Sequence, residues 1–228
     1  MKGFFFLLLK YIVSITEQEE GYLYMSDLKP IFRHSKDEVW KELSKEIGAE
    51  FIEGGRRKSD KLCAKVKEWT VTLDTYSVTA GGAQNTYTRM RSPYINRDNF
   101  KFSIYHRDFL SDIGKLLGMQ DITTGYSEFD REFIIKGNDK EKVKLLLANS
   151  KICELIQKEP TINLLIKEDE GWFTEDFPEG IDELYLEVTG VVKDVKRLKS
   201  MFDLFSEILN HLCHIGSAYE NDPKLSIQ

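Results

Sequence analysis

Apolar residues recur along this chain with two different periods, and the period changes from one segment to the next. A spacing of three to four residues predicts helices, and strict alternation predicts strands. Helices are predicted over 36–47, 108–117, the stretch after Asn138, 151–157 and 193–214. Strands are predicted over 50–53, 69–76, 86–91, 100–104, 129–136, 161–167 and 183–189. This order, with short connections, predicts an α+β fold: an antiparallel sheet packed against helices, with a long C-terminal helix.

The domain organisation follows from the same pattern. We expect a single composite α+β domain over residues 36–220, and a subdivision near 119–128 is the alternative. Residues 1–35 are expected to be a lead segment and 221–228 a tail. The strands between 50 and 104 are predicted to form a meander, because their linkers are too short for helical crossovers.

Two helix starts carry capping signals. Ser35 and Glu38 have the spacing of a capping box, and Gly48 is placed to end that helix. Asn138 is predicted to cap the helix that follows it, with Glu141 completing the box.

The last helix has an unusually apolar surface. Its apolar residues step by three and four, which is heptad spacing, and Met201, Leu204 and Ile208 add a second flank. Such a helix is either deeply buried in its own chain or shared with a partner. We expect a homodimer through this helix, with the interface made by Val195, Leu198, Phe202, Phe205 and Leu209.

The apolar start of the chain has several interpretations. The run over 4–15 is interrupted by Lys10 and is shorter than the about 20 residues that a membrane span needs. A segment packed on the domain is favoured; a membrane-surface anchor, a degenerate signal and a mis-assigned start are the alternatives. The three cysteines, Cys63, Cys153 and Cys213, form no C-x-x-C pair, which favours a reducing compartment and a cytoplasmic location.

Charge is distributed unevenly although the formal net charge is only -6. Eleven basic and four acidic residues lie between Gly54 and Arg107, whereas 168–187 holds nine acidic residues and no Lys or Arg. One interpretation is a basic surface, at 54–107, for an anionic partner. The favoured alternative is that the two segments face each other or are solvated. The sequence carries no strong nucleic-acid or membrane signal.

Motifs of catalysis and cofactor binding are missing from the sequence. It contains no G-x-S-x-G, no P-loop and no dinucleotide fingerprint, so we predict no catalytic residues and no cofactor. His211 and His214 are spaced to meet one ion on the last helix, but further ligands are remote in the sequence. Cationic side chains also suit a helix C-terminus, so we predict no metal site.

Two functions compete on this basis. The first is a non-catalytic binding or assembly protein. The alternative is a helix-grip-like carrier of a small apolar or anionic ligand, with an internal pocket lined by Phe129, Phe133, Phe202 and Phe205. An uncharacterised hydrolase is a third, weaker hypothesis. The polar groups predicted to contact a ligand are Arg89, Arg91, Arg131 and Trp172.

Several local runs occur together in a familiar combination. They are Leu73-Asp74-Thr75-Tyr76, Tyr87-Thr88-Arg89, Gly114-Lys115-Leu116-Leu117-Gly118 and Phe129-Asp130-Arg131-x-Phe133-x-x-Lys136-Gly137-Asn138-Asp139. Over about residues 36–220 the chain resembles a group of bacterial hypothetical proteins classed as a domain of unknown function. Typical members carry T-G-D-x-x-F-D; here Tyr126 stands where Asp is usual. The resemblance implies a bacterial origin and brings no activity, cofactor or catalytic residue.

Overall fold

The structure is a computed structural model and describes residues 35–55, 59–107, 119–168 and 177–225. All described elements belong to the unit His34–Gln228. The described helices are α2 (Lys36–Ile47), α3 (Ser127–Glu132), α4 (Lys140–Leu147), α5 (Ser150–Gln157) and α6 (Val195–His214). The described strands are β1 (Glu50–Ile52), β2 (Lys61–Val66), β3 (Trp69–Ala80), β4 (Ala83–Ile95), β5 (Phe102–His106), β6 (Gln120–Asp121), β7 (Phe133–Gly137), β8 (Ile162–Lys167) and β9 (Ile181–Thr189). The helix predicted over 108–117 lies outside the described residues.

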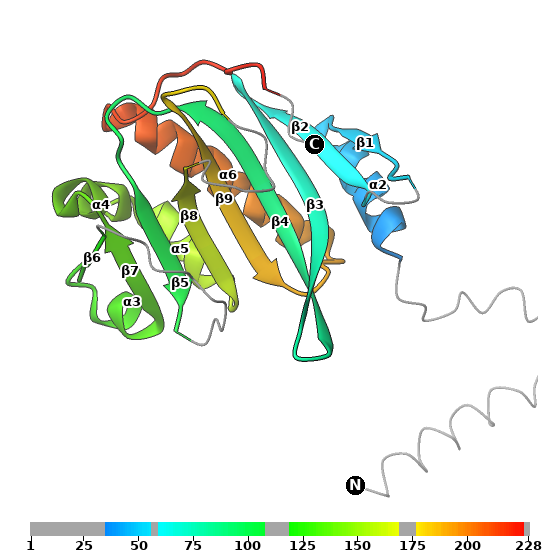
Figure 1. The fold of residues 1–228 in the computed structure, drawn as a ribbon, viewed down its shortest axis with the longest axis horizontal. Coiled ribbons are helices and arrows are strands. Elements are labelled where there is room, and N and C mark those ends of the chain that lie inside the picture. The colour runs from blue at the N-terminus through cyan, green and yellow to red at the C-terminus, as the bar shows by residue number, and fades with distance from the viewer. Residues whose placement is uncertain (1–34, 56–58, 108–118, 169–176, 226–228) are drawn as a thin grey trace, which may run out of the picture. The chain divides into compact units, whose positions relative to one another are not determined.

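The strands form one antiparallel sheet in the order β1-β2-β3-β4-β9-β8-β5-β7-β6. In Figure 1, α5 and α6 lie behind this sheet, so its other face is turned to the viewer. The predicted fold class, an antiparallel sheet packed against helices with a long C-terminal helix, is confirmed. The core lies between the sheet and the helices, where Leu184 and Leu186 of β9 and Leu198 of α6 are completely buried.

The predicted meander is right for the pairing of β3 with β4, but the sequence analysis missed β2, which lies between β1 and β3, and it is wrong for β5. Strands β9 and β8 lie between β4 and β5. After β4 the chain turns away at Asn96, whose amide donates to Phe100 O and to the Asp182 carboxylate at the start of β9. The free edge of β4 is thereby paired with β9, in a register that runs from Tyr87↔Thr189 to Ile95↔Ile181.

The strand predicted over 129–136 begins instead as helix α3, and only Phe133–Gly137 is a strand. The Asp130 carboxylate accepts hydrogen bonds from the backbone N–H groups of Thr124 (2.9 Å) and Gly125 (3.0 Å), which closes the chain into a turn. Phe129 and Phe133 pack together with ring centroids 4.7 Å apart. Their four-residue spacing suits a helix as well as a strand.

One helix cap was predicted correctly and the other was not. The capping box of Ser35 and Glu38 is present in full. The cap of α4, however, is Asp139, which accepts from the backbone N–H groups of Glu141 and Lys142. Asn138 instead accepts from Lys101 N and donates to Asn99 O, tying two connections together.

The apolar stripe of α6 is buried inside its own unit. Leu198, Phe205 and Leu209 are fully buried, Phe202 is 6% exposed, and Val195 packs against the same core. Of the two alternatives drawn from the heptad spacing, burial in the chain's own core accounts for these side chains, so they do not present a dimer surface. Dimerisation itself stays a prediction.

The four aromatic residues predicted to line an internal pocket, Phe129, Phe133, Phe202 and Phe205, belong to the same buried apolar cluster. Within the described ranges, no helix is both long and apolar enough to cross a membrane.

Gly137 tests the packing between β7 and α4. A Cβ added there would lie 2.6 Å from Val143 Cγ2 and 3.2 Å from Lys101 O. We expect Gly137→Ala to lower the free energy of unfolding by about 1–3 kcal/mol, because the extra methyl group overpacks the site. Gly55→Ala, where nothing lies within 4 Å, is the control and should change it by less than about 0.5 kcal/mol. Urea denaturation measures both, and equal values for the two variants would contradict this account.

Candidate functional site

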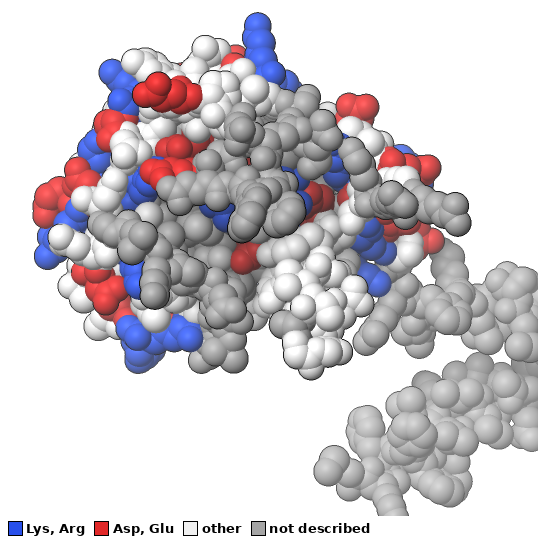
Figure 2. Space-filling model, in the orientation of Figure 1, with Lys and Arg blue, Asp and Glu red and all other residues white. Residues whose placement is uncertain are grey.

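The sheet face opposite the helices, which we call the polar face, carries charged residues along its central strands. Alternation along β9 sends Leu184, Leu186 and Val188 toward the helices. Glu183 and Glu187 therefore lie on the polar face. In Figure 2, which has the orientation of Figure 1, basic and acidic side chains are visible mainly toward the rim of this side of the molecule.

The register of the strands gathers these residues into one group. Arg89 lies opposite Asp74 on β3 and Glu187 on β9, and Lys167 on β8 lies opposite Glu183. We define the polar cluster by the residues that meet here: Asp74, Tyr76, Arg89, Arg91, Asn163, Lys167, Glu183, Tyr185 and Glu187.

Most of the polar cluster is buried, which is unusual for this side of a sheet, and Tyr76, Arg89 and Lys167 are half-buried. Asp74 and Glu183 are 7% exposed, Arg91 is 8% exposed and Glu187 is 6% exposed. The face of an antiparallel sheet that turns away from its helices is commonly solvated. Because buried charges are costly unless they are paired, the partners of each charge decide what the cluster does.

The Asp74 carboxylate binds both Arg89 and Arg91. It accepts from Arg89 Nε and an Arg89 terminal nitrogen, each at 2.7 Å, and from an Arg91 terminal nitrogen at 2.8 Å. Two guanidinium groups on one carboxylate leave this group with a net positive charge.

Glu187 is held by neutral donors. It accepts from Tyr76 Oη, from Tyr185 Oη at 2.6 Å and from Asn163 Nδ2 at 2.9 Å. Burial, together with the Glu187 carboxylate, raises the pKa of both tyrosines well above the usual range. The tyrosines therefore remain protonated donors, and this group keeps a net negative charge.

Glu183 and Lys167 take no part in the hydrogen bonds of Asp74 or Glu187. Although they lie opposite each other in the register, no hydrogen bond or ion pair of either side chain occurs in the described structure. Lys167 Nζ lies instead 3.1 Å from the ring centroid of Tyr185. Burial lowers the pKa of Lys167 to about 8 and raises the pKa of Glu183.

Three further polar atoms on the polar face are buried without a hydrogen-bond partner in the described structure: Arg91 Nε, Asn163 Oδ1 and Ser103 Oγ. Ser103 lies on β5, opposite Leu165 of β8. A buried polar atom that lacks a partner costs about 1–3 kcal/mol. Native structures contain few such atoms, and each needs an explanation, such as a ligand.

A groove of about 390 Å³ borders the polar cluster on the side of β2 and β3. Its lining includes Thr72, which lies opposite Arg91, and Pro93, which lies opposite Glu183. Lys61 and Lys224 also contribute to its walls. The polar face therefore has room for a small molecule immediately beside the cluster.

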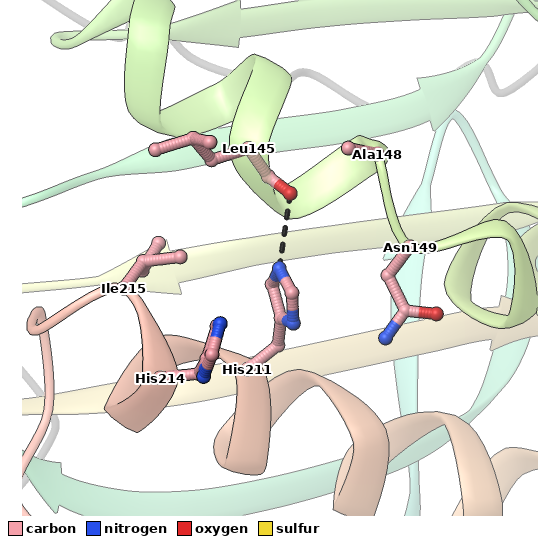
Figure 3. Close-up of a pocket in the computed structure, with 6 residues that line it drawn as sticks. All are labelled: Leu145, Ala148, Asn149, His211, His214 and Ile215. Atoms are coloured by element: carbon pink, nitrogen blue, oxygen red, sulfur yellow. Dashed lines mark hydrogen bonds between the residues drawn. The ribbon is translucent and has the colours of Figure 1, made fainter.

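A second pocket, of about 420 Å³, lies between the end of α6 and the connection from α4 to α5 (Figure 3). His211 Nε2 is 3.0 Å from Leu145 O, and the rings of His211 and His214 have centroids 5.5 Å apart. Among the described residues, no three or more His, Cys, Asp or Glu side chains lie together in a way that could hold a metal ion.

The residues predicted to contact a ligand separate into three outcomes. Arg89 and Arg91 lie together in the polar cluster. Arg131 lies elsewhere, on α3, with a side chain that is 72% exposed and 3.8 Å from Glu132. Trp172 lies outside the described residues.

Sequence reasoning missed Asp74, Lys167, Glu183 and Glu187 as site residues. The signal that was present is the placement of charged residues at alternate positions of strands whose other positions are apolar. The alternative in which the basic and acidic segments face each other holds for β4 and β9, which are neighbours in the sheet.

Comparisons with known proteins identify the fold alone. No family model matches the sequence, and no curated protein does. Among solved structures, the chain is similar to the crystal structure of the mycobacterial trehalose monomycolate transport factor A, TtfA. The TM-score is 0.50 at 6% sequence identity, over 79% of this chain and 96% of that chain.

The pKa of Lys167 gives a prediction with a defined sign. It is about 8 in the folded protein and 10.5 ordinarily, so the unfolded chain binds more protons between these pH values. The free energy of unfolding of the wild type, relative to Lys167→Met, should therefore rise by about 1–3 kcal/mol from pH 8 to pH 10.5. Urea denaturation across this pH range measures the difference.

The control for this experiment is Lys158→Met, which removes an exposed lysine from the helical side of the sheet. Parallel curves for the wild type and Lys167→Met would show that Lys167 has an ordinary pKa and would contradict the burial of its charge.

Proposed function

We propose that the protein is a non-catalytic binding protein that holds a small polar ligand on the polar face, against the polar cluster. The observation that carries this proposal is the set of buried atoms without partners, Arg91 Nε, Asn163 Oδ1 and Ser103 Oγ. They lie on three strands of one sheet face, and a ligand on that face supplies the missing partners.

A purely structural role explains the polar cluster less well. An ionic network that stabilises a sheet pairs opposite charges across neighbouring strands. Here Lys167 and Glu183 are opposite each other and yet are not paired. Departures from good pairing concentrate at functional sites, where they are offset by a bound partner.

Binding is favoured over catalysis by the state of the tyrosines. Tyr76 and Tyr185 both donate to Glu187, and their raised pKa values keep them protonated at neutral pH. Neither is therefore an activated nucleophile or base.

The fold comparison supports a carrier form of this proposal. The similar structure is that of a protein named as a transport factor. On this proposal the present chain also holds its ligand for transfer, and the polar cluster provides the contacts.

Native mass spectrometry of the purified full-length chain tests the proposal. We expect the wild type to carry additional mass of one small molecule beyond the 26.5 kDa of the chain. Arg91→Lys keeps a positive charge near Asp74 but removes the guanidinium Nε, so it should lose at least about nine-tenths of the bound molecule, equivalent to about 1.4 kcal/mol.

Arg131→Lys is the matched control, because Arg131 is exposed and lies outside the polar cluster. It should retain the bound molecule as the wild type does. Circular dichroism shows whether each variant is folded. A folded wild type that carries no additional mass, or a folded Arg91→Lys that keeps all of it, would overturn the proposal.

A further inference from the structure

We infer that the ligand of the polar face carries an anionic group, phosphate or carboxylate, with a hydrogen-bond donor such as a hydroxyl or amine beside it. This inference rests on the proposed function and names the ligand class of the same site. It depends on three charged side chains that keep free hydrogen-bonding capacity: Arg91, Lys167 and Glu183.

Two cations approach Tyr185 from both sides. Arg91 on β4 lies directly opposite Tyr185, and its Nε has no partner in the described structure. Lys167 reaches the same residue from β8, with Nζ over the Tyr185 ring. Strands β4 and β8 are separated by β9 alone, so their axes are about 10 Å apart and the two long side chains can share one anion between them.

The charges of the polar cluster balance, because Arg89, Arg91 and Lys167 lie beside Asp74, Glu183 and Glu187, but the donors Arg91 Nε and Lys167 Nζ have no acceptor in the described structure. Asp74 already accepts from both Arg89 and Arg91, and Glu187 is occupied by Tyr76, Tyr185 and Asn163. A phosphate or carboxylate offers both donors charge-assisted hydrogen bonds, which are stronger than those of a neutral acceptor.

A simple anion, however, does not suit Glu183. Its side chain is 7% exposed, lies opposite Lys167 in the register and would repel a negative group placed beside it. A carboxylate accepts hydrogen bonds and donates none when it is ionised. A hydroxyl or amine next to the anionic group of the ligand satisfies Glu183 and removes this conflict.

Asn163 and Ser103 add two further polar atoms that a ligand on the polar face would have to satisfy. Asn163 Oδ1 is an acceptor without a partner, and Ser103 Oγ both donates and accepts. Both therefore favour a ligand that has hydroxyl or amine groups in addition to its anionic end. A hydroxylated phosphate or carboxylate has this chemistry, either free in solution or as the headgroup of a lipid.

Three related probes separate the two requirements: glycerol 3-phosphate, ethyl phosphate and glycerol. Each is used at the same millimolar concentration, with protein freed of any co-purified molecule. The first has both groups, the second only the anion and the third only the hydroxyls. Isothermal titration calorimetry at pH 7 should give the tightest binding for glycerol 3-phosphate, at least about tenfold tighter than ethyl phosphate, and no binding of glycerol.

Two substitutions assign the contacts. Lys167→Gln should weaken the binding of glycerol 3-phosphate and of ethyl phosphate by at least about tenfold. Glu183→Gln should instead remove most of the difference in affinity between glycerol 3-phosphate and ethyl phosphate. Lys158→Gln and Glu154→Gln, both exposed residues on or next to α5, are the controls and should bind as the wild type does.

The outcomes distinguish this inference from the proposed function. Co-purified mass on the wild type together with equal binding of all three probes, or with no binding of any, overturns the inference and leaves the proposed function standing. No co-purified mass and no probe binding overturns both. Extraction of the co-purified molecule into chloroform or into water separates a lipid headgroup from a free compound, and a neutral molecule in either phase overturns the inference.

Discussion

The carboxylate of Asp74 binds both Arg89 and Arg91 and so fixes the hydrogen bonds of the two arginines at the centre of the polar face. Among the described residues, both arginines form their hydrogen bonds with Asp74 and none with the glutamates of β9, although the charge of Arg91 lowers the pKa of Glu183 against the effect of burial. Glu187 is therefore held by neutral donors, and Glu183 has no partner in the described structure. The double ion pair of Asp74 thus leaves the glutamates of β9 without a hydrogen-bonded cation in the described structure.

This arrangement depends on the long-range pairing of β4 with β9. The two strands are separated in the sequence by β5 to β8, yet they lie side by side in the sheet. Their pairing places the basic strand against the acidic one and sets Arg91 beside Tyr185. The helices on the opposite face supply the apolar core, in which Leu186 and Phe205 are completely buried. The apolar face stabilises the sheet, and on our proposal the polar face binds the ligand.

The features that the sequence predicted well are those that depend on neighbouring residues. The capping box at Ser35 and the spacing of α6 are local signals, and both helices are present. The order of the strands was not predictable in this way, because the partner of β4 is decided by contacts far along the chain. The stripe of α6 was assigned to a dimer because an apolar stripe has the same spacing whether it packs on a partner or on the chain's own sheet.

The site was predicted only in part for a similar reason. Arg89 and Arg91 stand out as basic residues in a strand, but Asp74 and Glu183 look like ordinary solvated carboxylates until the register places them. Arg131 was chosen by its charge and is exposed on α3, where no buried partner faces it.

A crystal structure of the protein as it is purified tests the central claim most directly, since that claim concerns the unpaired charges on the polar face. The account predicts density for a bound molecule, with one of its oxygen atoms within hydrogen-bond distance of Arg91 Nε and a polar group in contact with Lys167 or Glu183. A direct ion pair between Lys167 and Glu183, with Arg91 Nε bound to a protein acceptor, would contradict it.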